Sequence, residues 1–376
     1  MKRAGKIGCG ILIVLFVLLI IAVVAVQYIL KSHLGPIIQA QLPPVKEKLQ
    51  VRVLEVGGAS VNLLGGSVQI DSIKVGNPQG FQEPTLFALD RFRVEIGIGK
   101  LIKAALRKEV DLEIPRIELR NAELQLIRND EGAINLKVLT DTLNAGKTQS
   151  TAGTPVEKKA DRPAGQAASP LPKIYVKMVD INTVFRYLDH AVSKTEPINI
   201  ALKNSINIRN LATYNVGQIG DISITGALES DANLCKTDLK GHIAPIIDPE
   251  KPTFDIAGDV GHVDLRLIRP YMDMAGFGCD SLSLKVNIVC KDGVLDGKQS
   301  VLTLVMTKVL LTGDMPPGVN CINELTVPVP VEGTLSAPKV NLQKAVVKAI
   351  MDNLKGNAGS VISGAIGNAI SKDKKG

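Results

Sequence analysis

The spacing of hydrophobic residues changes twice along the chain and divides it into three parts. Residues 7–30 form an uncharged apolar run, which as a helix would span ~36 Å and cross a hydrocarbon core of about 30 Å with some tilt. In residues 31–50 the apolar positions recur at steps of three and four and are interrupted by prolines, which predicts a helical neck. From Val51 onwards the step falls to two, the spacing of β-strands. We therefore expect a transmembrane anchor at residues 1–30, followed by the neck and a β-rich remainder.

Positive charge flanks the apolar run unequally. Lys2, Arg3 and Lys6 precede the run, whereas Lys31 and His33 follow it. The positive-inside bias predicts that the N-terminus stays in the cytoplasm and that the rest of the chain crosses the membrane. A cleaved signal peptide is the alternative, but the small residues that would form its cleavage site lie inside the run.

The first β region is expected to cover residues 51–143. Its clearest alternation places Val94 and Ile96 on one face with polar residues between them. The same alternation predicts two separate strands at residues 110–119 and 122–127. An apolar face and a polar face are therefore expected for this part of the sheet.

One irregularity is predicted inside this region. Val68 and Ile70 are even-numbered, whereas Ile73 and Val75 are odd-numbered, so simple alternation would place the two pairs on opposite faces. They share one face only if a β-bulge lies near Ser72. We therefore expect a bulge there.

A basic amphipathic segment at residues 98–108 interrupts the strands and is expected to be helical. One interpretation is a helix that covers the end of the sheet and presents a solvated basic edge. The other is a helix that rests on the membrane surface beside the anchor. The residues proposed for that membrane contact are Lys100, Leu101, Ile102, Lys103 and Arg107.

Residues 144–172 contain four prolines and few large aliphatic side chains, so they cannot bury enough apolar area to offset their ordering entropy. We expect a disordered linker there and a second β region at residues 173–340. Residues 341–376 are expected to form amphipathic helices, at 341–354 and 361–370, and a basic tail. The expected strands of the second region are residues 173–180, 183–189, 197–209, 217–229, 232–243, 252–263, 281–290, 294–309 and 327–335, with a short helix at 264–275.

Composition narrows the class of protein. Aromatic residues make up 3% of the chain and tryptophan is absent, so any core is aliphatic. The net charge of +7 is modest and lies largely at the two ends, which suits anionic lipid headgroups. A nucleic-acid-binding face would need basic residues interleaved with aromatics, and the sequence offers none.

Residues able to carry catalysis or bind metal are scattered. Four histidines and five cysteines occur without a zinc-binding spacing, and no nucleophile or phosphate-loop motif is present. We expect no enzyme activity, metal or cofactor. Cys279 and Cys290 would lie about 35 Å apart at the ends of one strand, beyond disulfide reach. The sequence favours small buried thiols and, apart from the excluded Cys279–Cys290 pair, leaves open the disulfide pairing of Cys235, Cys279, Cys290 and Cys321.

Several motifs resemble those of the AsmA-like family of envelope proteins. In order, they are Leu101-Ile102, Ile114-Pro115-Arg116-Ile117, Asp130-Glu131-Gly132-Ala133-Ile134-Asn135, residues 264–312, and the segment from Leu325 to Val340. The third is similar to the family's D-G-x-x-N turn, although Glu131 is inserted. Two separate groups of matches occur in the family's order behind an apolar N-terminus.

The resemblance implies a mainly β fold in which an elongated antiparallel sheet forms an open trough. It implies a single-pass inner-membrane protein with a periplasmic bulk that moves or shields phospholipid between membranes in outer-membrane biogenesis. Its implied partners are an acyl lipid, the inner membrane, and another envelope protein at the C-terminal helices. The alternative is an envelope scaffold or assembly factor with a closed β core, because alternation is the same in both. The residues expected to line the trough are Val94, Ile96, Leu124, Leu126, Ile200, Ile222, Ile224, Leu282, Leu284 and Val286.

Overall fold

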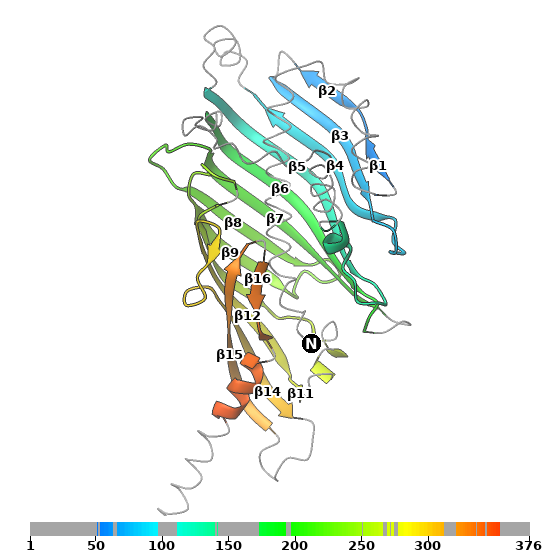
Figure 1. The fold of residues 1–376 in the computed structure, drawn as a ribbon, viewed down its shortest axis with the longest axis vertical. Helices are drawn as coiled ribbons and strands as arrows, with labels where there is room; N and C mark the ends of the chain where they lie inside the picture. The colour runs from blue at the N-terminus through cyan, green and yellow to red at the C-terminus, as the bar shows by residue number, and fades with distance from the viewer. Residues whose placement is uncertain are drawn as a thin grey trace, which may run out of the picture.

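The computed structural model describes residues 51–353, apart from residues 52, 63–65, 97–110, 140, 142–172, 193–196, 250, 266–268, 271, 274–276, 312–320, 336 and 343. The anchor, neck, basic helix at 98–108, linker at 144–172 and helix at 361–370 predicted above lie outside the described residues. No helix among the described residues has the length and apolar character needed to cross a membrane. The described strands form one 16-stranded sheet (Figure 1).

The strands follow one another across the sheet almost in chain order, from β1 at the upper right of Figure 1 to β14 and β15 at the bottom. Three pairs of strands lie end to end and share one position each: β1 with β2, β11 with β12, and β13 with β14. The sixteen described strands therefore fill thirteen positions across the sheet. At ~4.8 Å per step the sheet is roughly 58 Å long. The strands are β1 Leu54–Val56, β2 Ala59–Asn62, β3 Ser67–Gly76, β4 Thr85–Glu95, β5 Asp111–Arg128, β6 Lys173–Asp189, β7 Ile198–Ala212, β8 Gly220–Leu228, β9 Lys236–Ile243, β10 Phe254–Gly261, β11 Phe277–Gly278, β12 Ser281–Lys291, β13 Val294–Leu295, β14 Val301–Leu311, β15 Cys321–Thr334 and β16 Ala337–Val340.

The sheet is mixed, not antiparallel throughout as the sequence analysis expected. β5 and β6 are parallel, whereas the other ladders between described strands are antiparallel. A parallel pair needs a connection of a dozen or more residues to return the chain to the starting end, and residues 129–172 supply it. The pair joins the two predicted β regions into one sheet.

β5 and β6 are each a single long strand where two were expected. In β5, Asn121 has a φ of 52° and the register shifts between Leu119 and Ala122, so the strand absorbs an extra residue without ending. In β6, Asn182 lies between the two expected strands and is exposed on the polar face, beside Asp180, which accepts a hydrogen bond from Arg116 at 2.7 Å. The pairing on both sides continues through these positions.

The change of face predicted near Ser72 is confirmed, but it is not a β-bulge, because the pairs Asp71–Arg91 and Ile73–Leu89 with β4 keep one register. Ser72 has a φ of 55°, and the apolar residues before and after it pack in one cluster. Asn121 on β5 and Asn210 on β7, with a φ of 58°, also lie where the parity of the apolar residues changes. A single residue in the left-handed backbone conformation on each of these strands therefore keeps the apolar side chains before and after it on one face of the sheet.

The C-terminal strands differ from expectation in their bounds. Residues 294–309 form β13 and the start of β14, because a turn in which the Gln299 amide donates to the Asp296 carbonyl separates them. β15 begins at Cys321 and pairs with β16 only from Val331 onwards. Its two prolines, Pro328 and Pro330, therefore lie on a stretch that β16 does not cover, where their missing backbone donors cost no ladder hydrogen bond on that side.

Two helical segments flank the sheet. Residues 135–139 are helical after the turn that ends β5, and residues 344–353 are helical after β16, which confirms most of the helix predicted at 341–354. Within the helix predicted at 264–275, the described residues 265, 269–270 and 272–273 are helical. Both flanking segments pack against apolar clusters of the sheet.

Candidate functional site

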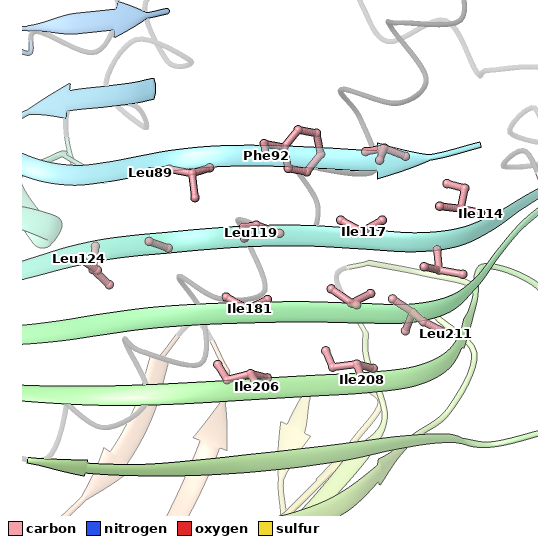
Figure 2. Packing of buried hydrophobic residues seen from close by; sticks show 14 of the residues in the cluster. Leu89, Phe92, Ile114, Ile117, Leu119, Leu124, Ile181, Ile206, Ile208 and Leu211 are labelled. Carbon is pink, nitrogen blue, oxygen red and sulfur yellow. The ribbon is translucent and has the colours of Figure 1, made fainter. Parts of the chain in front are cut away.

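The apolar face of the sheet carries a continuous row of aliphatic and aromatic side chains. Residues paired directly across neighbouring strands lie on the same face, so the register of the ladders identifies the row. Figure 2 shows part of it, with Phe92, Leu119, Ile181 and Ile206 in line on four strands. The full row from β3 to β15 is Ile70, Phe92, Leu119, Ile181, Ile206, Ile224, Leu239, Gly258, Val286, Leu302 and Val329.

A second apolar row lies beside the first. Its members are again direct cross-strand partners and are almost fully buried, with exposures of 0% at Val94, Ile117 and Val179. From β3 to β12 the two rows together make an uncharged strip that crosses nine strand positions, or ~38 Å at ~4.8 Å per step. The second row is Val68, Val94, Ile117, Val179, Ile208, Ile222, Gly241, Ile256 and Ile288.

The opposite face is polar. The residues next in sequence to the second row form a row of their own: Gln69, Arg93, Glu118, Asp180, Asn207, Ser223 and Lys240. Ion pairs link neighbouring strands there, including Arg116 to Asp180 at 2.7 Å and Arg186 to Glu123 at 3.2 Å. Along these rows charge is kept to one face and hydrocarbon to the other, whereas at the ends of β5 and β6 the apolar face carries the ion pair of Arg128 with the buried Asp189 at 3.2 Å.

A third row on the apolar face contains polar side chains at the middle of the sheet. Thr183 donates to the Ala122 carbonyl at 2.7 Å, and Thr237 donates to the Cys235 carbonyl at 3.2 Å. Asn204 lies between them in the row and donates to the Leu202 carbonyl at 3.2 Å. These donors are satisfied within the sheet, so the row makes this part of the face less apolar without requiring a ligand.

The ten residues predicted to line a trough all lie on the apolar face. Seven belong to or pack against the largest cluster, Leu282 belongs to a second cluster, and Val286 packs against a third. Leu284 is half-buried and pairs with Val260 and Leu304. The seven are Val94, Ile96, Leu124, Leu126, Ile200, Ile222 and Ile224.

Sequence reasoning missed several members of the same rows. Ile117, Val179 and Val329 are among the most buried side chains of the face, yet none was among the ten residues predicted to line it. Their own alternation was a usable signal for Val329, but the parity changes near Asn121 and Asn210 hid the continuity of the rows. The register of the ladders, which depends on pairing between distant strands, was required to find them.

In the part of the chain that the structure describes, catalytic or metal-binding groups do not gather at this face. Burial raises the pKa of the Cys235 and Cys279 thiols, so both stay protonated near neutral pH and are poor nucleophiles. Cys235, Cys279 and Cys321 are free thiols, and the Cys290 thiol donates to the Pro252 carbonyl at 3.4 Å. His190 contacts Glu83 at 2.7 Å and connects the end of β6 to the loop after β3. No cluster of metal-binding side chains occurs among the described residues.

Comparison with known proteins identifies the family. The model of the AsmA family matches residues 1–243, which ends at the last residue of β9. No curated protein matches the chain. Membership of this family indicates an envelope-associated protein. Because the matched segment covers more than half of the sequence, the chain belongs to the AsmA family.

Proposed function

We propose that the protein holds phospholipid or another acyl lipid on the apolar face of its sheet and moves or shields that lipid between membranes. The observation that carries the proposal is the uncharged strip formed by the first two rows, which runs without a charged side chain from β3 to β12. The polar opposite face would meet water. Membership of the envelope-associated AsmA family supports the same role.

The mechanism we propose is passive. Transfer of hydrocarbon from water stabilises the bound state by ~0.8 kcal/mol per CH₂ group. Because neighbouring positions of the rows are chemically alike, a bound acyl chain meets a similar environment at each strand and can slide with small barriers. A lipid gradient or a partner protein would then set the direction.

The direct test of this proposal is crosslinking. A photoreactive amino acid at Ile224, on the first row, is expected to form adducts with phospholipid in cells, whereas the same amino acid at Ser223, on the opposite face, is not. Mass spectrometry of the purified protein detects the adduct. Absence of lipid at Ile224, or equal labelling at both positions, would overturn the proposal.

Charge on the apolar face is expected to remove lipid without unfolding the sheet, both at Ile224 on the first row and at Leu284, which the register places on the third row beside Val260. Ile224 and Leu284 are only half-buried, so a carboxylate there stays partly hydrated. Ile224→Asp and Leu284→Asp should lower co-purified lipid several-fold and shift Tm by less than about 4 °C. Ser223→Asp and Ser283→Asp are the matched controls on the polar face and should retain wild-type lipid.

A closed core in an envelope scaffold is the competing function, and the near-complete burial of the second row favours it. Leu124 is buried in the largest cluster, so Leu124→Asp costs several kcal/mol in either case. Only a closed core predicts that Ile224→Asp, Leu284→Asp and Leu124→Asp each abolish cooperative unfolding and that the wild type carries no lipid. Native mass spectrometry and thermal unfolding of the five variants decide between the two functions.

We further propose the topology indicated by Lys2, Arg3 and Lys6, with the N-terminus in the cytoplasm and the sheet in the periplasm. A reporter enzyme that is active only outside the cytoplasm, fused after Gly376, is expected to show full activity. A reporter that is active only in the cytoplasm should be silent at the same position. The reverse pattern would remove both the localisation and the lipid route between membranes.

A further inference from the structure

The helix at residues 344–353 lies on the apolar face at the C-terminal end of the rows. Val346 is buried, and Ala345, Ala349 and Ile350 pack with it against a cluster that β12, β14 and β15 provide. That cluster contains Leu282, Met306, Val309, Ile322, Leu325, Val327 and Val329. The helix therefore covers the end of the strip that we propose for lipid.

The apolar surface of this helix is wider than the part that contacts the sheet. At 100° per residue, the apolar positions from Ala345 to Met351 cover an arc of ~240°, whereas a helix packed on one core needs an apolar stripe of about 100° or more. Val347 and Met351 are 55% and 50% exposed. The two side chains extend the apolar surface beyond the sheet and into solvent.

Positive charge borders these exposed side chains. Lys344 and Lys348 lie on the solvent side of the helix next to Met351, and Asp352 follows them. An amphipathic helix with lysines beside an exposed apolar strip is the pattern that inserts into the interface of an anionic membrane. A second copy of this chain fits less well, because two such faces would bring their lysines together.

We propose that the helix at residues 344–353 docks the C-terminal end of the sheet on an anionic phospholipid bilayer, with Val347 and Met351 entering the boundary between headgroups and acyl chains. This inference rests on the proposed function and adds the surface at which lipid enters or leaves the strip. Because the inner side of the same helix packs in one cluster with Val329, the last member of the first row, docking places the end of that row beside the bilayer.

The absence of tryptophan allows a direct test. Val347→Trp gives the full-length protein, held in a nonionic amphipol, a single tryptophan on the proposed docking side. Vesicles of phosphatidylglycerol and phosphatidylethanolamine are expected to shift its emission to the blue, and brominated acyl chains to quench it. Vesicles of phosphatidylcholine alone should act more weakly, and added salt should weaken the effect on anionic vesicles.

The control places the tryptophan at another exposed apolar residue. Ile219, in the loop between β7 and β8, is 62% exposed. The tryptophan of Ile219→Trp is therefore expected to keep the same emission whether or not vesicles of either kind are present. The double variant Val347→Asp, Met351→Asp should lower the affinity for anionic vesicles by about tenfold or more, whereas Ile219→Asp should leave it unchanged. Sedimentation with vesicles measures both.

The outcomes separate this inference from the proposed function. An unchanged emission at Val347→Trp, with lipid adducts still formed at Ile224, would overturn the docking and leave the lipid role intact. A blue shift that grows with protein concentration in the absence of vesicles would identify a second copy as the occupant and also overturn it. A vesicle-dependent shift without adducts at Ile224 would support the docking and overturn the lipid role.

Discussion

Replacing Gly241 by alanine is expected to destabilise the sheet by about 3 kcal/mol. Gly241 lies on β9 between Ile222 and Ile256 of the neighbouring strands. A Cβ atom there would lie 1.8 Å from the Asp255 carbonyl oxygen and 2.8 Å from the Ile256 Cα. These are backbone atoms of β10, so a rotamer change cannot relieve the clash and the two strands must separate. Urea unfolding measures the loss as a lower midpoint.

The matched control is Gly261 on β10. A Cβ atom there meets no heavy atom within 4 Å, so Gly261→Ala is expected to change stability by less than about 0.5 kcal/mol. Equal losses in the two variants would show that the effect comes from the conformational freedom of glycine and not from the close approach of β9 and β10.

The same close approach shapes the apolar face. Gly258 on β10 belongs to the first row and has a φ of 150°, and a Cβ atom there would lie 2.0 Å from the Asp238 carbonyl oxygen. Each of the two apolar rows therefore lacks a side chain where β9 meets β10. Hydrocarbon bound along the rows would approach the backbone most closely at this point.

The sequence predicted the face of a side chain well within each strand. Ile222 and Ile224, or Leu282 and Leu284, share a face because the period of a strand is two and does not depend on which strand lies beside it. The prediction was less reliable at residues with a left-handed backbone conformation, because the apolar side chains change there from even-numbered to odd-numbered positions or the reverse. The change near Ser72 was predicted because apolar residues lie on both sides of it, whereas that near Asn121 was taken as the boundary between two strands.

Pairing between strands was the part that the sequence did not provide. β5 and β6 are joined by residues 129–172, and no local pattern states whether the strand after so long a connection lies parallel or antiparallel to the one before it. The rows depend on that register, since Ile117 pairs with Val179 and Leu119 with Ile181 only in the parallel arrangement observed. The chemistry of the face was thus predictable, but its continuity across the whole sheet was not.

The second large effect is expected at Asn135, the asparagine of the family's turn motif. Asn135 is fully buried, and its amide nitrogen donates to Asn77 Oδ1 and to the Gln125 carbonyl, both at 2.8 Å. Its oxygen accepts from the Ile127 and Leu136 amides at 3.0 and 2.8 Å. One side chain therefore connects the end of β5, the helix at residues 135–139 and the loop after β3, which explains why the motif contains asparagine.

Asn135→Ala is expected to lower the free energy of unfolding by about 4 kcal/mol, because it leaves several buried polar groups without a partner. Asp141→Ala, which removes an exposed ion pair with Lys137 near the same helix, should cost less than about 1 kcal/mol.

Asn77 is also fully buried and donates to the Glu83 and Thr85 carbonyls, so Asn77→Ala is destabilising in its own right. The double variant should then lose less than the sum of the single losses, by about 1–2 kcal/mol, because the hydrogen bond between the two asparagines can be removed only once. Strict additivity in a double-mutant cycle measured by urea unfolding would show that the two asparagines act independently and that the motif is not held in place by this contact.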